Sequence, residues 1–180
     1  MVEYLPVIRD EPTRHRVNRN PLRVLAPTSA AAALAVGVLI AGCSNGPERD
    51  SETGALVEAT DVNVFDLRVG DCLDGFSDDP EISTVRAVPC SEEHTDEIMA
   101  AVDLSEEDEF PGVDAVKERA EETCHEQFEQ FVGVPWDESQ LDFGYLAPTE
   151  KSWSDGDREI LCTIGDPHQA VTGTLRDTNR

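Results

Sequence analysis

Two short groups of residues in this chain have types and spacings that could do chemistry. In the first, His94 and Glu97 stand three residues apart and could form a metal-binding or acid/base pair. A strand places residues that are three apart on opposite faces, so we favour a hydrogen-bonded turn after Cys90 over a reactive pair. We therefore expect neither a catalytic residue nor a metal ion at this position.

The second group combines an aromatic ring with charged side chains. Trp153, Asp157 and Arg158 could clamp a ligand, because exposed aromatic residues and arginine are enriched at binding hot spots. The favoured alternative is a turn at Gly156, across which Trp153 packs while Asp157 pairs with Arg158 or caps the turn. Trp136 is the other tryptophan of the chain. A flat or grooved surface around the two tryptophans would indicate an interaction module.

The sequence lacks the signatures of common enzymes and cofactor sites. Ser91 and His94 are not part of the GxSxG elbow of a hydrolase. The acidic runs at 78–81 and 106–109 lack the spacing of a calcium-binding loop. We expect no cofactor, and at most weak, non-specific binding of divalent cations.

The five cysteines divide by position. Cys43 ends an apolar run, which leaves Cys72, Cys90, Cys124 and Cys162. Outside the cytoplasm an even set of cysteines predicts two disulfides, and sequence alone does not choose among the three pairings. We favour Cys72–Cys90, which flanks a short acidic loop. The second pair is then Cys124–Cys162, on the apolar faces of a helix and a strand.

A metal site is the competing interpretation of these thiols. It would use the four residues Cys90, His94, Cys124 and His125. No CxxC pair or HxxxH spacing supports it, and an oxidising compartment disfavours free thiolates.

Residues 1–42 have the layout of a secretory signal peptide. A basic stretch precedes the apolar run Ala30–Leu39, which is too short to span a membrane comfortably. The run ends in LIAGC at Leu39–Cys43, which resembles the lipobox of bacterial lipoproteins, whose cysteine is lipidated and becomes the mature N-terminus. The alternative is an ordinary signal peptide, or an uncleaved anchor, with a chance cysteine. The basic stretch is long, which also fits a translation start near Val17.

Lipidation would decide where the protein resides. Two or more acyl chains on Cys43 would hold it stably at the outer face of the cell membrane, with membrane lipid as its first partner. The remaining residues 43–180 carry 9 basic and 35 acidic side chains, a net charge of −26. Nucleic acid and anionic lipid headgroups attract basic proteins, so this charge excludes nucleic-acid binding.

The mature chain predicts a tether, one domain and a frayed end. Residues 43–60 are polar and aperiodic and predict a flexible tether; residues 61–176 form the domain, and residues 177–180 fray. Between the strands, Pro148–Asp157 supplies turn residues. Alternating apolar residues predict strands over 62–69, 84–90, 97–104, 141–147 and 160–164.

One segment has helical periodicity instead. Its apolar stripe consists of Val113, Val116, Ala120, Cys124, Phe128 and Phe131, and Gly133 stands where a glycine cap belongs. The expected fold class is α+β: a small antiparallel sheet of about five strands with one packed amphipathic helix and two disulfides.

The ordered motifs of this domain resemble the septum formation domain of actinobacterial lipoproteins and membrane proteins. The resemblance covers roughly residues 64–176 and rests on the following stretches: LRVGDCL at 67–73, VPCSEEHTDEI at 88–98, the helix around Cys124, WSDGDREILC at 153–162 and TGTLR at 172–176. It implies an extracytoplasmic, disulfide-bonded domain linked to cell division, with no established activity.

The expected function is a non-enzymatic, membrane-anchored interaction module in septum formation or envelope biogenesis. Its partner would be an envelope or divisome protein or a wall polymer. The alternative is a small-ligand-binding lipoprotein or an envelope enzyme with a site near His94, Glu97 and Asp157. A concave pocket with perturbed titratable groups would favour that alternative.

Overall fold

The computed structural model describes residues 2–6, 46–76, 82–104 and 109–180. Cys43, the acidic run at 78–81 and most of the run at 106–109 lie outside these residues. None of the described helices is both long and apolar enough to cross a membrane.

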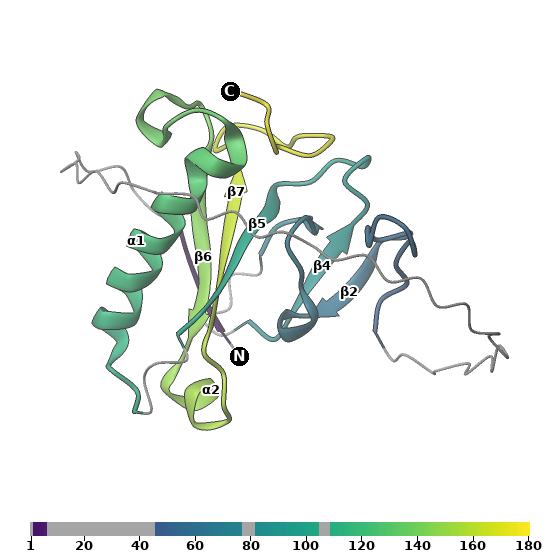
Figure 1. The fold of residues 1–180 in the computed structure, drawn as a ribbon. Helices are drawn as coiled ribbons and strands as arrows, with labels where there is room; N and C mark the ends of the chain where they lie inside the picture. The colour runs from purple at the N-terminus through teal and green to yellow at the C-terminus, as the bar shows by residue number, and fades with distance from the viewer. Residues whose placement is uncertain (1, 7–45, 77–81, 105–108) are drawn as a thin grey trace, which may run out of the picture. The chain divides into compact units, whose positions relative to one another are not determined.

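The fold is an antiparallel sheet with one long helix packed on it (Figure 1). The strand order is β1-β6-β7-β5-β3-β4-β2. The strands are β1 (Val2–Pro6), β2 (Thr60–Asn63), β3 (Cys72–Leu73), β4 (Thr84–Val88), β5 (Asp96–Asp103), β6 (Asp142–Pro148) and β7 (Glu159–Gly165). The helices are α1 (Val113–Val132), α2 (Glu150–Ser154) and the single 3₁₀ turns η1 (Val64–Asp66) and η2 (Trp136–Glu138).

Helix α1 supplies six of the eighteen buried residues of the larger core. Five of its six predicted stripe residues are buried, and Val113, at the first turn, is exposed. They pack against the side chains that β6 and β7 direct to the same face, among them Phe143, Tyr145 and Ile160. Gly133 ends the helix in the left-handed conformation at φ 96°, as predicted.

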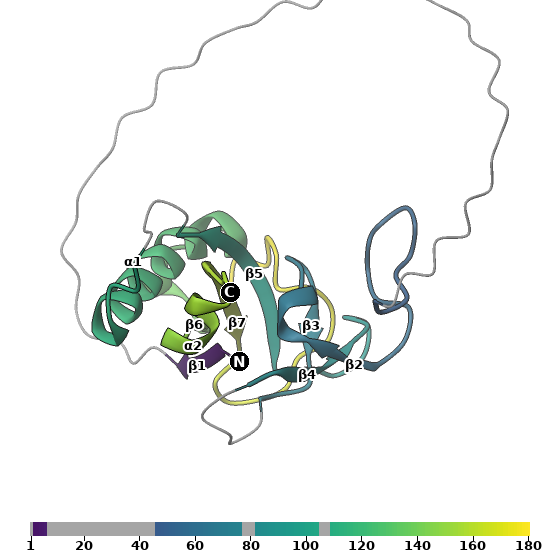
Figure 2. The ribbon, with the colours of Figure 1, turned by 90° about the horizontal axis from the view of Figure 1, so that it is seen from below.

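A second core fills the opposite face of the sheet. The sheet curls at β3, β4 and β2 (Figure 2), and Leu73, Ile98 and Leu161 lie in this cluster. The register of β5 against β7 shifts between Ile98 and Ala100, an irregularity of the kind that bends a strand. The α+β class with one main helix is therefore confirmed, and the sheet has more strands than the five expected.

The two favoured disulfides are confirmed. Cys72 bonds to Cys90 and Cys124 bonds to Cys162, with Cα–Cα distances of 5.2 and 5.3 Å. The first links β3 to the turn after β4, and the second fastens α1 to the centre of β7. The competing metal site of Cys90, His94, Cys124 and His125 is wrong, because its two thiols belong to different disulfides.

The strand expected over 62–69 is mostly wrong. It ends at Asn63, whose side chain accepts a hydrogen bond from the backbone N–H of Phe65 and starts the 3₁₀ turn η1. Phe65 and Val69 are exposed, and Leu67 is buried. The apolar residues do alternate along this segment, but the hydrogen bond from the Phe65 N–H to the Asn63 side chain stabilises a 3₁₀ turn in place of the strand.

The segment 148–157 also differs from the expectation of turn residues alone. It contains helix α2, started by a reciprocal capping box between Thr149 and Ser152. Ser152 occupies the position where glutamate or glutamine is usual, which made the box hard to recognise from sequence.

Both predicted loose ends of the domain need correction. Within the supposed tether 43–60, Leu56 is buried and Arg49 pairs with Asp71, so the described part of this segment packs on the domain. At the other end, Asp177 and Asn179 donate backbone N–H groups to the carbonyls of Phe131 and Val132. The carbonyls at a helix C-terminus lack partners within the helix, and here the supposed frayed end satisfies two of them.

The strand β1 was not anticipated. Val2–Pro6 pairs antiparallel with β6, from Val2 opposite Pro148 to Pro6 opposite Gly144. It lies inside the segment assigned to a signal peptide, whose cleavage would remove it from the mature protein.

We expect loss of the Cys124–Cys162 bond to destabilise the domain substantially. The bond joins residues 38 apart, for which chain entropy gives about 4 kcal/mol, against about 3 kcal/mol for the shorter loop of Cys72–Cys90. The double variant Cys124→Ser/Cys162→Ser should lower the free energy of unfolding, measured in urea, by about 4 kcal/mol. The matched control is Cys72→Ser/Cys90→Ser, which removes only the shorter loop and should cost about 3 kcal/mol. Unchanged unfolding of Cys124→Ser/Cys162→Ser would contradict the assignment.

Candidate functional site

The Gly70-Asp71-Cys72 motif is held against the start of β5. Gly70 donates its N–H to the Ile98 carbonyl and Ile98 donates to the Asp71 carbonyl, each at 2.8 Å. Gly70 has a φ of 93°, a conformation that side chains other than glycine rarely adopt. Cys72 then stands opposite Glu97 in the β3–β5 register.

Asp71 acts as an anchor for the preceding segment. Its carboxylate accepts two hydrogen bonds from the guanidinium of Arg49 and one from the backbone N–H of Arg68. The Asp71 hydrogen bond raises the pKa of Arg49, against the opposing effect of burial. The arrangement is a bidentate, partly buried ion pair, which suits structural positioning rather than proton transfer.

His94 is fully buried and held by backbone contacts. Its main chain exchanges two hydrogen bonds with Val171, at 3.0 and 2.9 Å. Nδ1 lies 2.9 Å from the Glu92 carbonyl, so Nδ1 carries the proton. Nε2 has no hydrogen-bond partner among the described residues.

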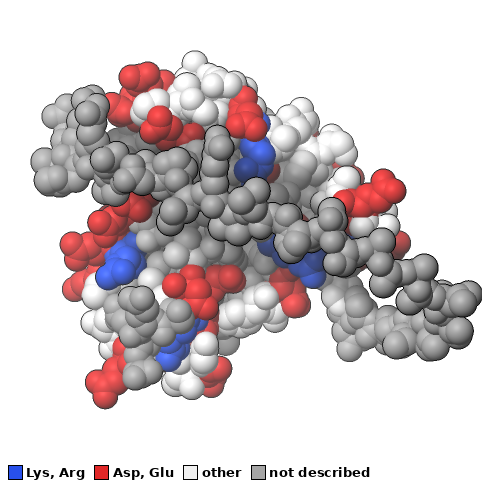
Figure 3. Space-filling model, in the orientation of Figure 1, with Lys and Arg blue, Asp and Glu red and all other residues white. Residues whose placement is uncertain are grey.

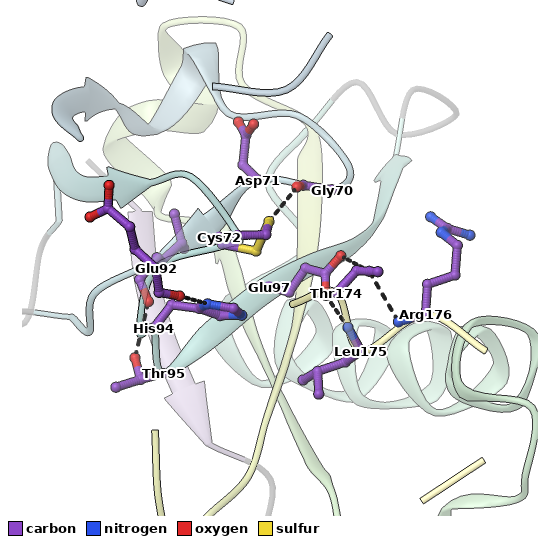
Figure 4. The surroundings of a disulfide bond; sticks show 12 residues. Gly70, Asp71, Cys72, Glu92, His94, Thr95, Glu97, Thr174, Leu175 and Arg176 are labelled. Carbon is purple, nitrogen blue, oxygen red and sulfur yellow. Dashed lines mark hydrogen bonds between the residues drawn. A yellow bond between two sulfur atoms is a disulfide. The ribbon is translucent and has the colours of Figure 1, made fainter. Parts of the chain in front are cut away.

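Glu97 is a buried carboxylate that two residues near the C-terminus satisfy. One oxygen accepts the Thr174 hydroxyl at 2.7 Å and the other accepts the Leu175 N–H at 2.6 Å (Figure 4). Only 1% of Glu97 is exposed. Burying a polar or charged group costs free energy unless it is hydrogen-bonded, and the two donors offset this cost for Glu97.

Three motifs that are distant in sequence therefore meet at one disulfide. We call this group the motif cluster, defined as Asp71, Cys72, Cys90, His94, Glu97 and Thr174 (Figure 4). Gly173 completes it by donating its N–H to the Cys90 carbonyl at 2.6 Å. Sequence reasoning missed the roles of Arg49, Thr174 and Leu175, although TGTLR was already a landmark of the family resemblance.

The motif cluster offers three ligand atoms of the kind that metals bind. The sulfurs of Cys72 and Cys90 and a carboxylate oxygen of Glu97 lie within 4.8 Å of one another. The two sulfurs are joined in a disulfide, and the thiolate is the form that binds metals. With the disulfide formed, the geometry supports a structural crosslink and not a metal centre.

The second candidate group forms a packed corner at the end of β6. Trp153 is buried in α2, and the Arg158 guanidinium lies 3.8 Å from the centre of its ring. Arg158 also donates to the carbonyls of Trp153 and Asp157, both at 2.7 Å, while Asp157 accepts from the N–H of Glu159. A buried indole beneath a stacked arginine stabilises the corner and leaves no open aromatic face for a ligand.

Trp136 lies at the other end of β6. Its indole donates to Asp142, the first residue of the strand, and packs edge-on against Phe143 and His125. Trp153 instead follows Pro148, the last residue. The two tryptophans are therefore separated by the length of a strand and do not share one surface.

The residues of the alternative site are likewise not brought together. His94 and Glu97 lie at the start of β5, whereas Asp157 precedes β7, whose first residue pairs with the last residue of β5. A cavity of about 280 Å³ lies among the described residues, and none of the candidate residues lines it. It is lined by Leu104, Pro111, Ala115, Val116, Glu118, Arg119 and Glu122.

The comparisons with known proteins give one match. The family model described as septum formation matches residues 45–179, three quarters of the chain. The chain belongs to the septum formation family. No curated protein and no solved structure matches it.

Membership in the septum formation family agrees with the geometry. The matched region begins before Arg49 and ends at Asn179, so it includes the two segments that close the domain at Asp71 and at the end of α1. It links the protein to septum formation, and the two disulfides indicate an oxidising compartment outside the cytoplasm.

We expect Glu97→Gln to weaken the domain by about 1–3 kcal/mol, because the amide nitrogen replaces one acceptor and leaves a buried donor unsatisfied. Equilibrium unfolding in urea measures the difference. Glu93→Gln, at an exposed position four residues earlier, is the matched control and should change little. Equal stability of the two variants would show that the contacts of Glu97 do not hold the C-terminal segment.

Glu159 provides a prediction about pH. Burial, with the nearby charges of Asp157 and Asp103, raises its pKa above the ordinary 4.5. A carboxyl whose pKa is raised by folding destabilises the folded state once the pH exceeds the raised value. Glu159→Gln should therefore raise the unfolding free energy at neutral pH by up to about 1 kcal/mol, the size of a cross-strand like-charge pair. The gain should vanish below the unfolded pKa, and a gain that is independent of pH would refute the electrostatic cause.

Proposed function

We propose that this protein is a lipid-anchored, non-enzymatic interaction module that acts at the outer face of the cell membrane in septum formation. Cys43 is the anchor, and the folded domain contacts an envelope or divisome protein or a wall polymer. The family supplies the link to the septum, and the sequence around Cys43 supplies the anchor.

The observation that carries the proposal is where the family match begins. It starts at residue 45, two residues after Cys43. Cleavage before a lipidated Cys43 would thus release the whole matched domain and no more than a two-residue linker. The described part of the segment after it packs on the domain through Arg49 and Leu56, so the domain would sit close to the membrane surface.

The use of the motif residues supports an interaction role over catalysis. His94, Glu97 and Asp71 are buried and engaged in contacts that hold loops together, and Trp153 is covered. A general acid or base must reach the proton that it transfers, directly or through one water. These side chains are instead spent on the stability of the domain, which leaves its surface to determine its partners.

The charge of that surface narrows the class of partner. Acidic side chains are spread over the face seen in Figure 3, and residues 43–180 carry a net charge of −26. Such a surface repels anionic polymers and anionic lipid headgroups at short range. We expect a neutral or cationic partner, such as a protein segment.

The test is fluorescence microscopy of a C-terminal fusion in dividing cells of the source organism, with a fluorophore that matures outside the cytoplasm. We expect enrichment at division sites. The Cys43→Ala variant removes the lipidation site and should lose or blur this enrichment, with the protein recovered from the soluble fraction.

A matched control distinguishes anchoring from folding. Cys43→Ala leaves both disulfides intact, so the released domain should unfold in urea like the parent domain. An even outline of fluorescence around the cell would contradict a septal function, and membrane retention of Cys43→Ala would contradict the anchor.

A further inference from the structure

The two edges of the sheet differ in how they are protected. The edge strand β2 is four residues long and carries an exposed Asp61, which lies 3.7 Å from Arg86. Short edge strands and charged side chains are the usual means of preventing further strands from pairing. On the other side of the sheet β1 is the outermost strand, and β6 lies next to it. Between its two terminal residues β6 has neither a charged side chain nor a proline.

The unprotected stretch of β6 is uncharged along its length. It runs through Phe143, Gly144, Tyr145, Leu146 and Ala147, between Asp142 and Pro148. A strand of this kind with an unpaired side offers a row of backbone donors and acceptors to any extended chain.

In the full-length chain, β1 occupies this edge (Figure 2). The ladder is five residue pairs long and ends in a proline on each side, with Pro148 opposite Val2 and Pro6 opposite Gly144. Because proline has no N–H to donate, the ladder cannot easily extend beyond these pairs. The edge is therefore suited to a segment of about this length.

We infer that the outer edge of β6 is a docking site for an extended segment of a partner protein, which adds to the sheet as an antiparallel strand in the place of β1. The inference rests on the proposed function, because processing before Cys43 removes Val2–Pro6 and bares the edge. A translation start at Val17 would have the same result.

The charges favour a partner protein over a second copy. Two domains of net charge −26 would have to align their β6 edges at strand distance, and like charges oppose this approach. The segment seated on the edge, Val2–Pro6, has a single charged side chain, Glu3. We expect the partner segment to be extended, uncharged at its centre and neutral or basic overall.

We expect the mature domain to fold without β1. The buried hydrophobic side chains that the structure describes all lie between Leu56 and Leu175, and both disulfides lie within the same range. Residues 44–180 can therefore be compared with the full-length chain.

The first measurement is amide hydrogen exchange on both proteins. In residues 44–180, the amides of 144–147 that face β1 should exchange at least tenfold faster than in the full-length chain, while α1 and β7 keep their protection. Equal protection of these amides in both proteins would overturn the inference, as would failure of residues 44–180 to fold.

The second measurement adds the strand back as a labelled peptide of residues 2–9 and follows its fluorescence anisotropy. Binding to residues 44–180, with restored protection of the amides of 144–147 that face the peptide, is the expected result. The full-length chain should bind at least tenfold more weakly, because its own β1 competes. The control peptide carries Tyr4→Pro and Leu5→Pro; neighbouring N–H groups of a strand point to opposite sides, so one of these substitutions removes a donor to β6.

The remaining outcomes also decide the matter. Equal binding of the proline peptide would show that the backbone is not what is recognised and would overturn the inference. A dimer of residues 44–180 in sedimentation velocity that the peptide dissociates would place a second copy at the edge instead. Even localisation around the cell would remove the septal function and leave this edge as it is, so the two failures are distinguishable.

Discussion

The hydrogen bonds that the buried Glu97 carboxylate accepts from Thr174 and Leu175 hold the C-terminal segment against the sheet, and the rest of the domain depends on them. A carboxylate enters an apolar interior only when donors satisfy its oxygens, and both donors, at Thr174 and Leu175, come from the end of the chain. The C-terminal segment is therefore required for β5 to be buried where it is. Once in place, it also receives the contacts of Cys90 and His94, so the motif cluster assembles around it.

The same segment completes the helix. Beyond Leu175 it supplies N–H groups to the last carbonyls of α1, and the Arg176 guanidinium lies 4.3 Å from the ring of Phe131. One stretch of chain thus joins the sheet to the helix, in parallel with the Cys124–Cys162 disulfide. The family match runs to residue 179 and therefore includes this double connection.

The residues with the most reactive chemistry are those that the fold uses internally. His94, Glu97, Asp71 and Trp153 are buried, and each contributes to a turn, an ion pair or a packed corner. These side chains are therefore committed to the stability of the domain. Strand β6 carries no charged side chain between Asp142 and Pro148, whereas residues 43–180 as a whole carry a net charge of −26.

The sequence by itself determined the elements whose signals are local: the helical stripe with its cap at Gly133 and the alternation of β5 and β6. It also predicted two disulfides from four cysteines, but the tertiary structure decided which cysteines pair. Only the tertiary structure decided which distant groups satisfy one another. The partners of Glu97 lie 77 and 78 residues away, and no periodicity encodes such a contact. For the same reason, the two ends of the domain looked polar and aperiodic in the sequence but are held in place in the structure. Arg49 bonds to the Asp71 carboxylate, and the N–H of Asn179 bonds to the Val132 carbonyl. Both acceptors are in position only once the core has formed.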